Sequence, residues 1–157
     1  MLKLPKIEIQ YASANLEEKI QALVTPKKIR QWVLMVLSNL LGEITVRFVN
    51  QAESKALNQN FRQRDKATNV LTFTYTDDGQ GKPKINHRLQ ADIVICWPVV
   101  LAEARAQSKS SEAHLAHLVL HGCLHARGFD HEKPQAAKKM EVLEVAALKM
   151  LGYPNPY

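Results

Sequence analysis

The stretch Ile93-Val94-Ile95-Cys96-Trp97, followed directly by Pro98, decides the fold that this sequence predicts. The run is apolar on both faces, which is typical of a strand that lies inside a sheet. Proline suits the first turn of a helix, because its missing N–H is not needed there. We therefore expect a buried strand that leads without a loop into a helix reaching about Ser108.

Further strands and helices are predicted on both sides of this strand. Alternating apolar residues predict strands at residues 7–11 and 44–48, and a β-branched and aromatic run predicts another at 70–75. Gly42 is expected to end the first helix of the chain, and residues 77–84 (DDGQGKPK) to form a turn-rich connection. Helical spacing of apolar residues predicts helices over residues 26–40, over 52–61, from 111 into the histidine-rich segment, and over 134–151.

The order of these elements, β-α-β-α-β-β followed by helices, predicts an α+β fold. We expect helices packed on a mostly antiparallel or mixed four-stranded sheet, as a single pair of layers. A length of 157 residues fits one domain over residues 1–157, and a chain of this size buries roughly two-thirds of its unfolded surface.

The composition excludes several classes of protein. Hydrophobic residues make up 46% and charged residues 23%, close to the averages of globular proteins, so a disordered chain is excluded. No run approaches the roughly 18 apolar residues that span a bilayer, and the N-terminal MLKLPKIEIQY lacks the features of a secretory signal. The two cysteines, Cys96 and Cys123, do not make a disulfide scaffold, so we expect a protein of the reducing cytoplasm without a membrane partner.

The charge balance is basic. Twenty-one Lys and Arg residues against 15 Asp and Glu residues give a net charge of +6. A basic surface raises the local concentration of polyanions such as nucleic acid. Many basic proteins bind no nucleic acid specifically, so the charge needs a motif beside it.

The segment His121-Gly-Cys-Leu-His125-Ala-Arg-Gly128-Phe-Asp-His131 carries the strongest chemical signal. Positions four apart on a helix differ by about 40° in direction, so His121 and His125 point the same way, one turn apart. Gly128 can end the helix in a left-handed conformation, after which His131 can return to the same point. Three neutral imidazoles that leave a coordination position open are typical of catalytic zinc. We therefore predict one Zn²⁺ per chain, on this helix and the turn that follows it.

Other residues of this segment are interpreted differently. Cys123 lies about 200° around the helix from His121 and is expected to be a small core residue. His114 and His117 are expected to be exposed or packed, with support of a ligand imidazole as the alternative. The same spacing of His and Gly occurs in metzincin peptidases, which carry a glutamate base directly after the first His. Here that residue is Gly122, which cannot transfer a proton, so this route to peptidase chemistry lacks its base.

A basic loop at residues 62–69 (RQRDKATN) precedes the strand at 70–75. Its cations and its hydroxyl and amide groups can hold phosphate oxygens. On composition alone, a solvated loop with Asp65 as an internal ion-pair partner is the better interpretation. The candidate contacts to a phosphate-bearing ligand are Arg62, Arg64, Lys66, Thr68 and Asn69.

Together these segments resemble the YbeY family of bacterial metal-dependent endoribonucleases. The histidine signature of that family is matched by residues 121–131 without a gap, and the resemblance spans about residues 46–152. A third segment matches at Asp92, Ile93 and Ile95, and Ala91 stands directly before it where the family has glycine. The further matching positions are Phe61-Arg62, Asp65, Thr68 to Phe73, Met140 and Glu144.

The resemblance implies a zinc-dependent endoribonuclease that prefers single strands and acts in maturation of small-subunit ribosomal RNA and in ribosome quality control. Its implied partners are ribosomal RNA precursors and the ribosome or its proteins. It also implies that Arg62 is catalytic and lies beside the metal, where a bidentate contact would stabilise charge on the phosphate. Asp130 is expected to support a ligand imidazole, with proton acceptance as the alternative. Either water or the 2′-hydroxyl of the RNA can be the attacking group.

Two other functions compete with this interpretation. One is a zinc hydrolase of another substrate class, including peptides, against which Gly122 argues. The other is a non-catalytic, ribosome-associated RNA-binding factor with a structural metal. A structural zinc ion is normally closed by a fourth protein ligand, so the three-histidine pattern argues against it.

Overall fold

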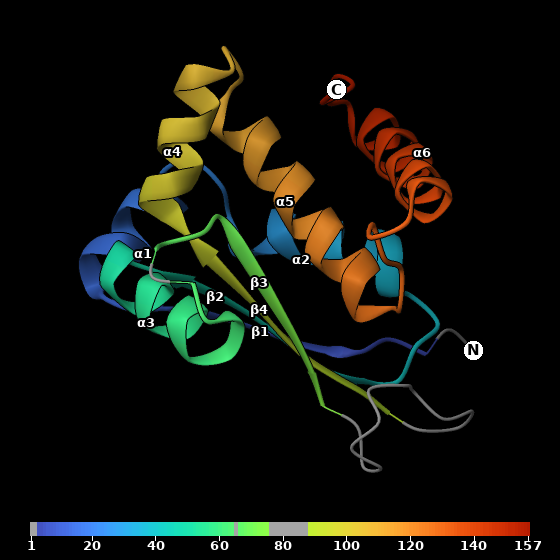
Figure 1. Ribbon diagram of the computed structural model, residues 1–157, viewed down its shortest axis with the longest axis horizontal. Coiled ribbons are helices and arrows are strands. Elements are labelled where there is room, and N and C mark those ends of the chain that lie inside the picture. Colours follow the sequence, from blue (N-terminus) through green and yellow to red (C-terminus); the bar gives the residue numbers. More distant parts are fainter. Residues whose placement is uncertain (1–2, 65, 76–87) are drawn as a thin grey trace.

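Strand β4 (Leu89–Cys96) lies inside a four-stranded sheet in the computed structural model, which describes residues 3–64, 66–75 and 88–157 (Figure 1). The strands follow the order β1 (Lys6–Tyr11), β2 (Gly42–Val49), β4 and β3 (Val70–Tyr75). β1 is parallel to β2 and β2 is parallel to β4, whereas β3 is antiparallel to β4. The sheet is therefore mixed, one of the two arrangements expected from the sequence.

Helices pack on this sheet, so the predicted α+β fold is confirmed. None of those in the described ranges is long and apolar enough to cross a bilayer. Their bounds are α1 (Ala14–Gln21), α2 (Pro26–Leu37), α3 (Gln51–Arg62), α4 (Trp97–Ala106), α5 (Ser111–Ala126) and α6 (Pro134–Leu151).

The main core lies between one face of the sheet and the helices that cover it. Phe48 of β2 and Ile93 and Ile95 of β4 are fully buried there, together with residues of α2 and α5. The opposite face carries a smaller core, against which Leu57 of α3 packs, made of Val49, Leu71, Val94 and Cys96. Both faces of β4 are covered, which is the physical reason for its unbroken apolar run.

Helix α1 is not predicted by the apolar spacing of the sequence. The Ser13 hydroxyl caps it by accepting a hydrogen bond from the Leu16 N–H at 3.2 Å. Leu16 and Ile20, four residues apart, are its buried residues. The helix is short and otherwise polar, so its pattern is weak and its stability depends on packing against the core.

The expectation that Gly42 ends the first long helix is wrong. Helix α2 ends at Leu37, and the chain leaves it through an extended Ser38 and a left-handed Asn39 with φ of 67°. Gly42 instead opens β2, where a Cβ would lie 1.9 Å from the carbonyl oxygen of Leu89. Glycine is required there because β4 approaches so closely. The expected connection at residues 77–84 falls outside the described residues.

Helix α5 lies between α4 and α6 in Figure 1 and contacts α2, β3 and β4 as well. At Gly122 it approaches the sheet most closely: a Cβ there would lie 2.8 Å from Ile93 Cγ2 and 3.2 Å from Thr72 Oγ1. Real Cβ atoms do not come that close to a branched core side chain. Gly122 therefore sets the depth at which α5, with its histidines, packs on β3 and β4.

We predict that Gly122→Ala lowers the free energy of unfolding by up to about 2 kcal/mol, measured by urea titration. Alanine would add up to about 1 kcal/mol of helix propensity, but overpacking at this contact costs about 1–3 kcal/mol. Ile93→Leu, which lacks the Cγ2 methyl group, is the matched background, and there Gly122→Ala should cost less. A Gly122→Ala protein more stable than wild type would show that the contact does not limit packing.

Candidate metal centre and nucleic-acid cleft

Helix α5 and the turn after it carry the three histidines of the predicted metal centre. His121 and His125 lie one turn apart on the helix, which ends at Ala126. Gly128 follows with φ of +109°, and its N–H donates to the carbonyl of His125 at 2.9 Å. This left-handed turn brings His131 back toward the helix, as the sequence predicts.

The three imidazoles converge on one point. One nitrogen from each of His121, His125 and His131 lies within 4.8 Å of the others. The Nε2 atoms of His121 and His125 are 3.1 Å apart. Tetrahedral zinc with Zn–N bonds of about 2.0–2.1 Å separates its ligand nitrogens by about 3.3 Å. The donor set and its spacing therefore fit one metal ion.

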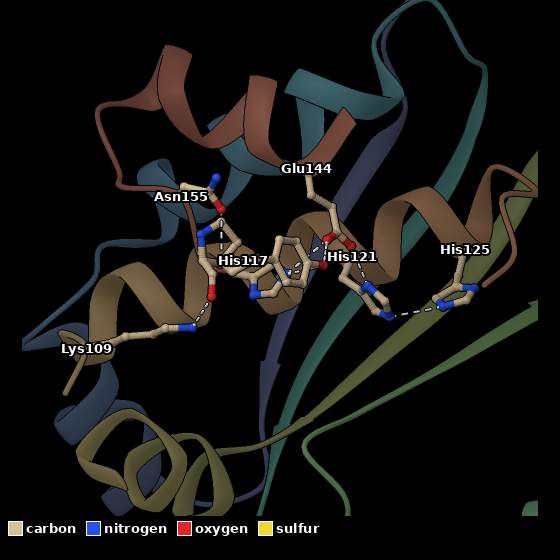
Figure 2. A network of polar contacts seen from close by, with 8 residues as sticks. Lys109, His117, His121, His125, Glu144 and Asn155 are labelled. Atoms are coloured by element: carbon tan, nitrogen blue, oxygen red, sulfur yellow. Dashed lines mark hydrogen bonds and ion pairs between the residues drawn. The ribbon is translucent and has the colours of Figure 1, made fainter. Parts of the chain in front are cut away.

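Hydrogen bonds on the far side of two rings orient them toward that point, and the bond between His121 and Glu144 is drawn in Figure 2. His121 Nδ1 lies 2.5 Å from Glu144 Oε1, and His125 Nδ1 donates to the Phe129 carbonyl at 3.0 Å. Both Nε2 atoms remain for the metal. Burial, with the charges of His121 and His131, lowers the pKa of His125 to about 4. His125 is therefore neutral at pH 7, the form that binds a metal ion.

Glu144 of α6 is the carboxylate behind His121. It is fully buried, contacts His117 Nε2 at 3.1 Å, and accepts a hydrogen bond from the Tyr157 hydroxyl. Burial raises the pKa of Glu144, but the hydrogen bonds from His117, His121 and Tyr157 outweigh it and hold that pKa at about 2. Glu144 is thus an anion that fixes the tautomer and the orientation of His121.

The structure thereby adds residues that sequence reasoning did not assign to the site. The sequence places Glu144 in the family by resemblance without a role. It predicts an exposed or packed His117, with support of a ligand imidazole as the alternative, and the contact with Glu144 favours that alternative. A signal was present: Glu144 lies between Met140 and Leu148, the other two buried residues of α6, at a spacing of four. A carboxylate at a core-facing position requires a buried partner.

A second set of potential ligand atoms, from His117, His121 and Glu144, also lies within 4.8 Å. These three side chains already hydrogen-bond to one another through Glu144. Their arrangement is that of a buried hydrogen-bond network behind the metal centre.

The remaining histidine and cysteine of α5 belong to the interior. His114 is buried and its Nε2 lies 3.0 Å from Glu103 Oε1, so its expected packed position is confirmed. Cys123 is fully buried in the main core, and burial raises the pKa of its thiol. Cys123 faces the core, as the helical spacing predicts.

One cleft of about 390 Å³ joins the histidines to the basic loop. The two groups of residues that the sequence singled out, 50 or more positions apart, therefore line the same hollow. Its walls are Asn58, Arg62, Arg64, Lys66, Thr68, Asn69, Val70, Leu71, Thr72, His121, His125, Asp130, His131 and Glu132.

The cations of this cleft are exposed. Arg62 ends α3, and Gln63 follows in the left-handed conformation with φ of 57°. Within the described ranges, no hydrogen bond or ion pair engages the side chains of Arg62, Arg64 and Lys66. The proposed ion-pair partner Asp65 lies outside those ranges. These cations are available to an anionic ligand in the cleft.

Two buried polar residues of α3 hold the loop in place. Asn58 Nδ2 donates to the Lys66 carbonyl at 2.8 Å. The Ser54 hydroxyl donates to the Thr68 carbonyl and accepts from the Thr68 N–H, both at 3.0 Å. Sequence reasoning missed this clamp, although polar residues four apart on a buried helix face are a signal for it.

The other expected contact residues have partners within the protein. Thr68 lines the cleft with its backbone held by Ser54. The Asn69 amide donates to Glu103 at 3.1 Å and its Oδ1 accepts from the Val70 N–H at 2.7 Å. Asp130 lines the cleft beside His131, and its Oδ1 accepts from the Glu132 N–H at 3.0 Å.

Comparison with known proteins identifies relatives along nearly the whole chain. A family model described as Endoribonuclease YbeY matches residues 6–152. Proteins named Endoribonuclease YbeY from Polynucleobacter asymbioticus and from a Janthinobacterium species are 47% and 46% identical over 151 residues, which is 96% of this chain and 92% and 93% of theirs.

A solved structure has a similar fold. The solution structure of a Thermotoga maritima protein is 25% identical, covers 93% of this chain with 91% of its own, and gives a TM-score of 0.51. The range that the family model matches, residues 6–152, contains the basic loop, β4 and all three histidines of the cleft. On this evidence the chain belongs to the YbeY endoribonuclease family.

Proposed function

We propose that this chain, as a single domain, is a zinc-dependent endoribonuclease that prefers single-stranded RNA and acts in maturation of small-subunit ribosomal RNA and in ribosome quality control. The observation that carries the proposal is the cleft that joins three convergent imidazoles to exposed cations. Ribosomal RNA precursors are the proposed substrate and the ribosome or its proteins the proposed partners, which makes the cytoplasm the proposed compartment.

The proposed metal ligands are the Nε2 atoms of His121 and His125 and a ring nitrogen of His131. Zinc bound there would act as a Lewis acid and lower the pKa of a bound water to near 7. The protein supplies orientation: Glu144 and the Phe129 carbonyl hold two of the rings. The third ring is carried on the turn at Gly128.

Arg62 is the proposed catalytic cation. It lines the same cleft as the histidines, and its planar guanidinium can hold two phosphate oxygens as charge builds on phosphorus. Arg64 and Lys66 are proposed to bind neighbouring phosphates of the strand. Thr68 and Asn69 are proposed substrate contacts at the cleft wall, and Asp130 a supporting group beside His131.

The competing functions are less consistent with the site. A peptidase of the metzincin type needs a glutamate where Gly122 packs against Ile93, and a Cβ already collides there. A purely structural zinc ion would need a fourth protein ligand beside the three histidines. The described residues offer three ligands in a cleft.

The proposed function predicts cleavage of a short unstructured RNA that stops with chelator and returns with added zinc. The same RNA annealed to its complement is the matched control and should be cut more slowly. Affinity should fall steeply with salt, because phosphate contacts release counterions. Gel analysis of RNA and of casein under the same conditions makes the comparison. Chelator-sensitive cleavage of casein with RNA intact would contradict the proposal.

Replacing a ligand should remove the metal. We expect His121→Ala, His125→Ala and His131→Ala each to lower zinc per chain well below one, measured by native mass spectrometry, because a three-ligand site loses a third of its donors. His114→Gln, which keeps a donor toward Glu103 and lies outside the ligand set, should retain zinc. Full zinc occupancy in all three alanine variants would overturn the assignment.

Arg62, the last residue of α3, and Arg64, two residues further along the chain, form a matched pair. If Arg62 contacts the scissile phosphate as charge develops, Arg62→Ala should lower the single-turnover rate at saturating RNA by roughly a hundred- to a thousandfold. Arg62→Lys should recover little, since an ammonium lacks the two-pronged geometry. Arg64→Ala should mainly weaken binding. A wild-type rate for Arg62→Ala at saturating RNA would make Arg62 a binding residue only.

A further inference from the structure

Residues 153–157 return from the end of α6 to the back of the metal centre (Figure 2). They follow Gly152, a left-handed cap with φ of 88°, and lie beyond the residues that the family model matches. The Tyr157 hydroxyl donates to Glu144 Oε2. The Tyr157 ring meets the His117 ring edge-on, with centroids 5.5 Å apart. This segment therefore touches the network that holds His121.

Specific contacts seat the segment. Lys109 Nζ donates to the Pro156 carbonyl at 2.7 Å, and the Tyr157 N–H donates to Asn155 Oδ1 at 2.9 Å. At the other end, Tyr153 donates to Glu112 at 3.0 Å and packs edge-on against Trp32. The segment is held at both ends, which keeps the Tyr157 hydroxyl on Glu144 although Tyr157 is 62% exposed.

The hydrogen bonds of Glu144 show what that hydroxyl does. Oε1 is bonded to His121, whereas Oε2 is shared by His117 and Tyr157. A fully buried carboxylate is held in one rotamer by the donors that its two oxygens accept. If the Tyr157 donor is removed, His117 is the partner that Oε2 keeps among the described residues, and rotation of the carboxylate would weaken the bond to His121.

We propose that Tyr157 is a positioning residue of the metal centre, which acts through Glu144 on the ligand His121. This inference rests on the zinc site of the proposed function. Partners that hydrogen-bond to a ligand histidine are worth roughly 10- to 100-fold in metal affinity. Tyr157 lies one step further away, so its removal should cost roughly three- to tenfold.

Zinc affinity, measured by competition with a chromophoric chelator in the absence of RNA, tests the proposal. Glu144→Gln should weaken zinc binding by roughly 10- to 100-fold, and Tyr157→Phe by roughly three- to tenfold. Tyr153→Phe is the matched control, because it removes a tyrosine hydroxyl that does not touch Glu144. The segment stays seated in this variant, since the ring still packs on Trp32 and the backbone N–H still donates to the Leu148 carbonyl at 2.8 Å. Tyr153→Phe should bind zinc like wild type. In a Glu144→Gln background, Tyr157→Phe should have little further effect, as expected for residues in one relay.

Lys109→Met tests the same proposal with a residue that does not contact Glu144. It removes the hydrogen bond that holds the Pro156 carbonyl and leaves the Tyr157 side chain intact. It should weaken zinc binding in the same direction as Tyr157→Phe. Wild-type zinc affinity in Tyr157→Phe would overturn the proposal, and so would equal losses in the two tyrosine variants, which would indicate general packing. Neither result would contradict the assignment of His121, His125 and His131 as zinc ligands, which the histidine variants test separately.

Discussion

The close contact of Gly122 with Ile93 and Thr72 is the constraint on which the site depends. Because no side chain separates the helix from the sheet there, α5 packs deeply over β3 and β4. Cys123 then enters the core, while His121 and His125 emerge on the flank that faces the cleft. A bulkier residue would lift the helix and move both imidazoles away from the loop cations. Position 122, which holds the glutamate base in a metzincin peptidase, holds a glycine here, and this glycine sets how closely α5 packs on the sheet.

Local patterns predict much of this molecule. The apolar run ending at Trp97 predicts the buried strand, and the spacing of His121, His125 and His131 around Gly128 predicts their convergence. These features succeed because strand burial, helix periodicity and a glycine turn depend on neighbours in sequence. Helix α1 and the role of Gly42 depend on which element packs beside them, and sequence patterns do not supply that information.

The same limit explains the missed polar residues. Glu144 acquires its role only when α6 brings it to His121, and Ser54 and Asn58 acquire theirs when the loop folds back over α3. The clamp also separates two tasks within the loop. Backbone atoms of Lys66 and Thr68 take the structural hydrogen bonds, which leaves the charged side chains for the cleft. Cations not neutralised by internal partners give a stronger field for an incoming polyanion.

At Gly128 the backbone conformation, and not a lack of space for a side chain, is what favours glycine. A Cβ added there would meet nothing within 4 Å, yet φ is +109°, a region that L residues rarely adopt. A D residue has the mirror-image preference and would enter this conformation without strain. A D residue at position 128 would therefore favour the turn that returns His131 to the metal centre, and it would restrict the unfolded chain more than glycine does.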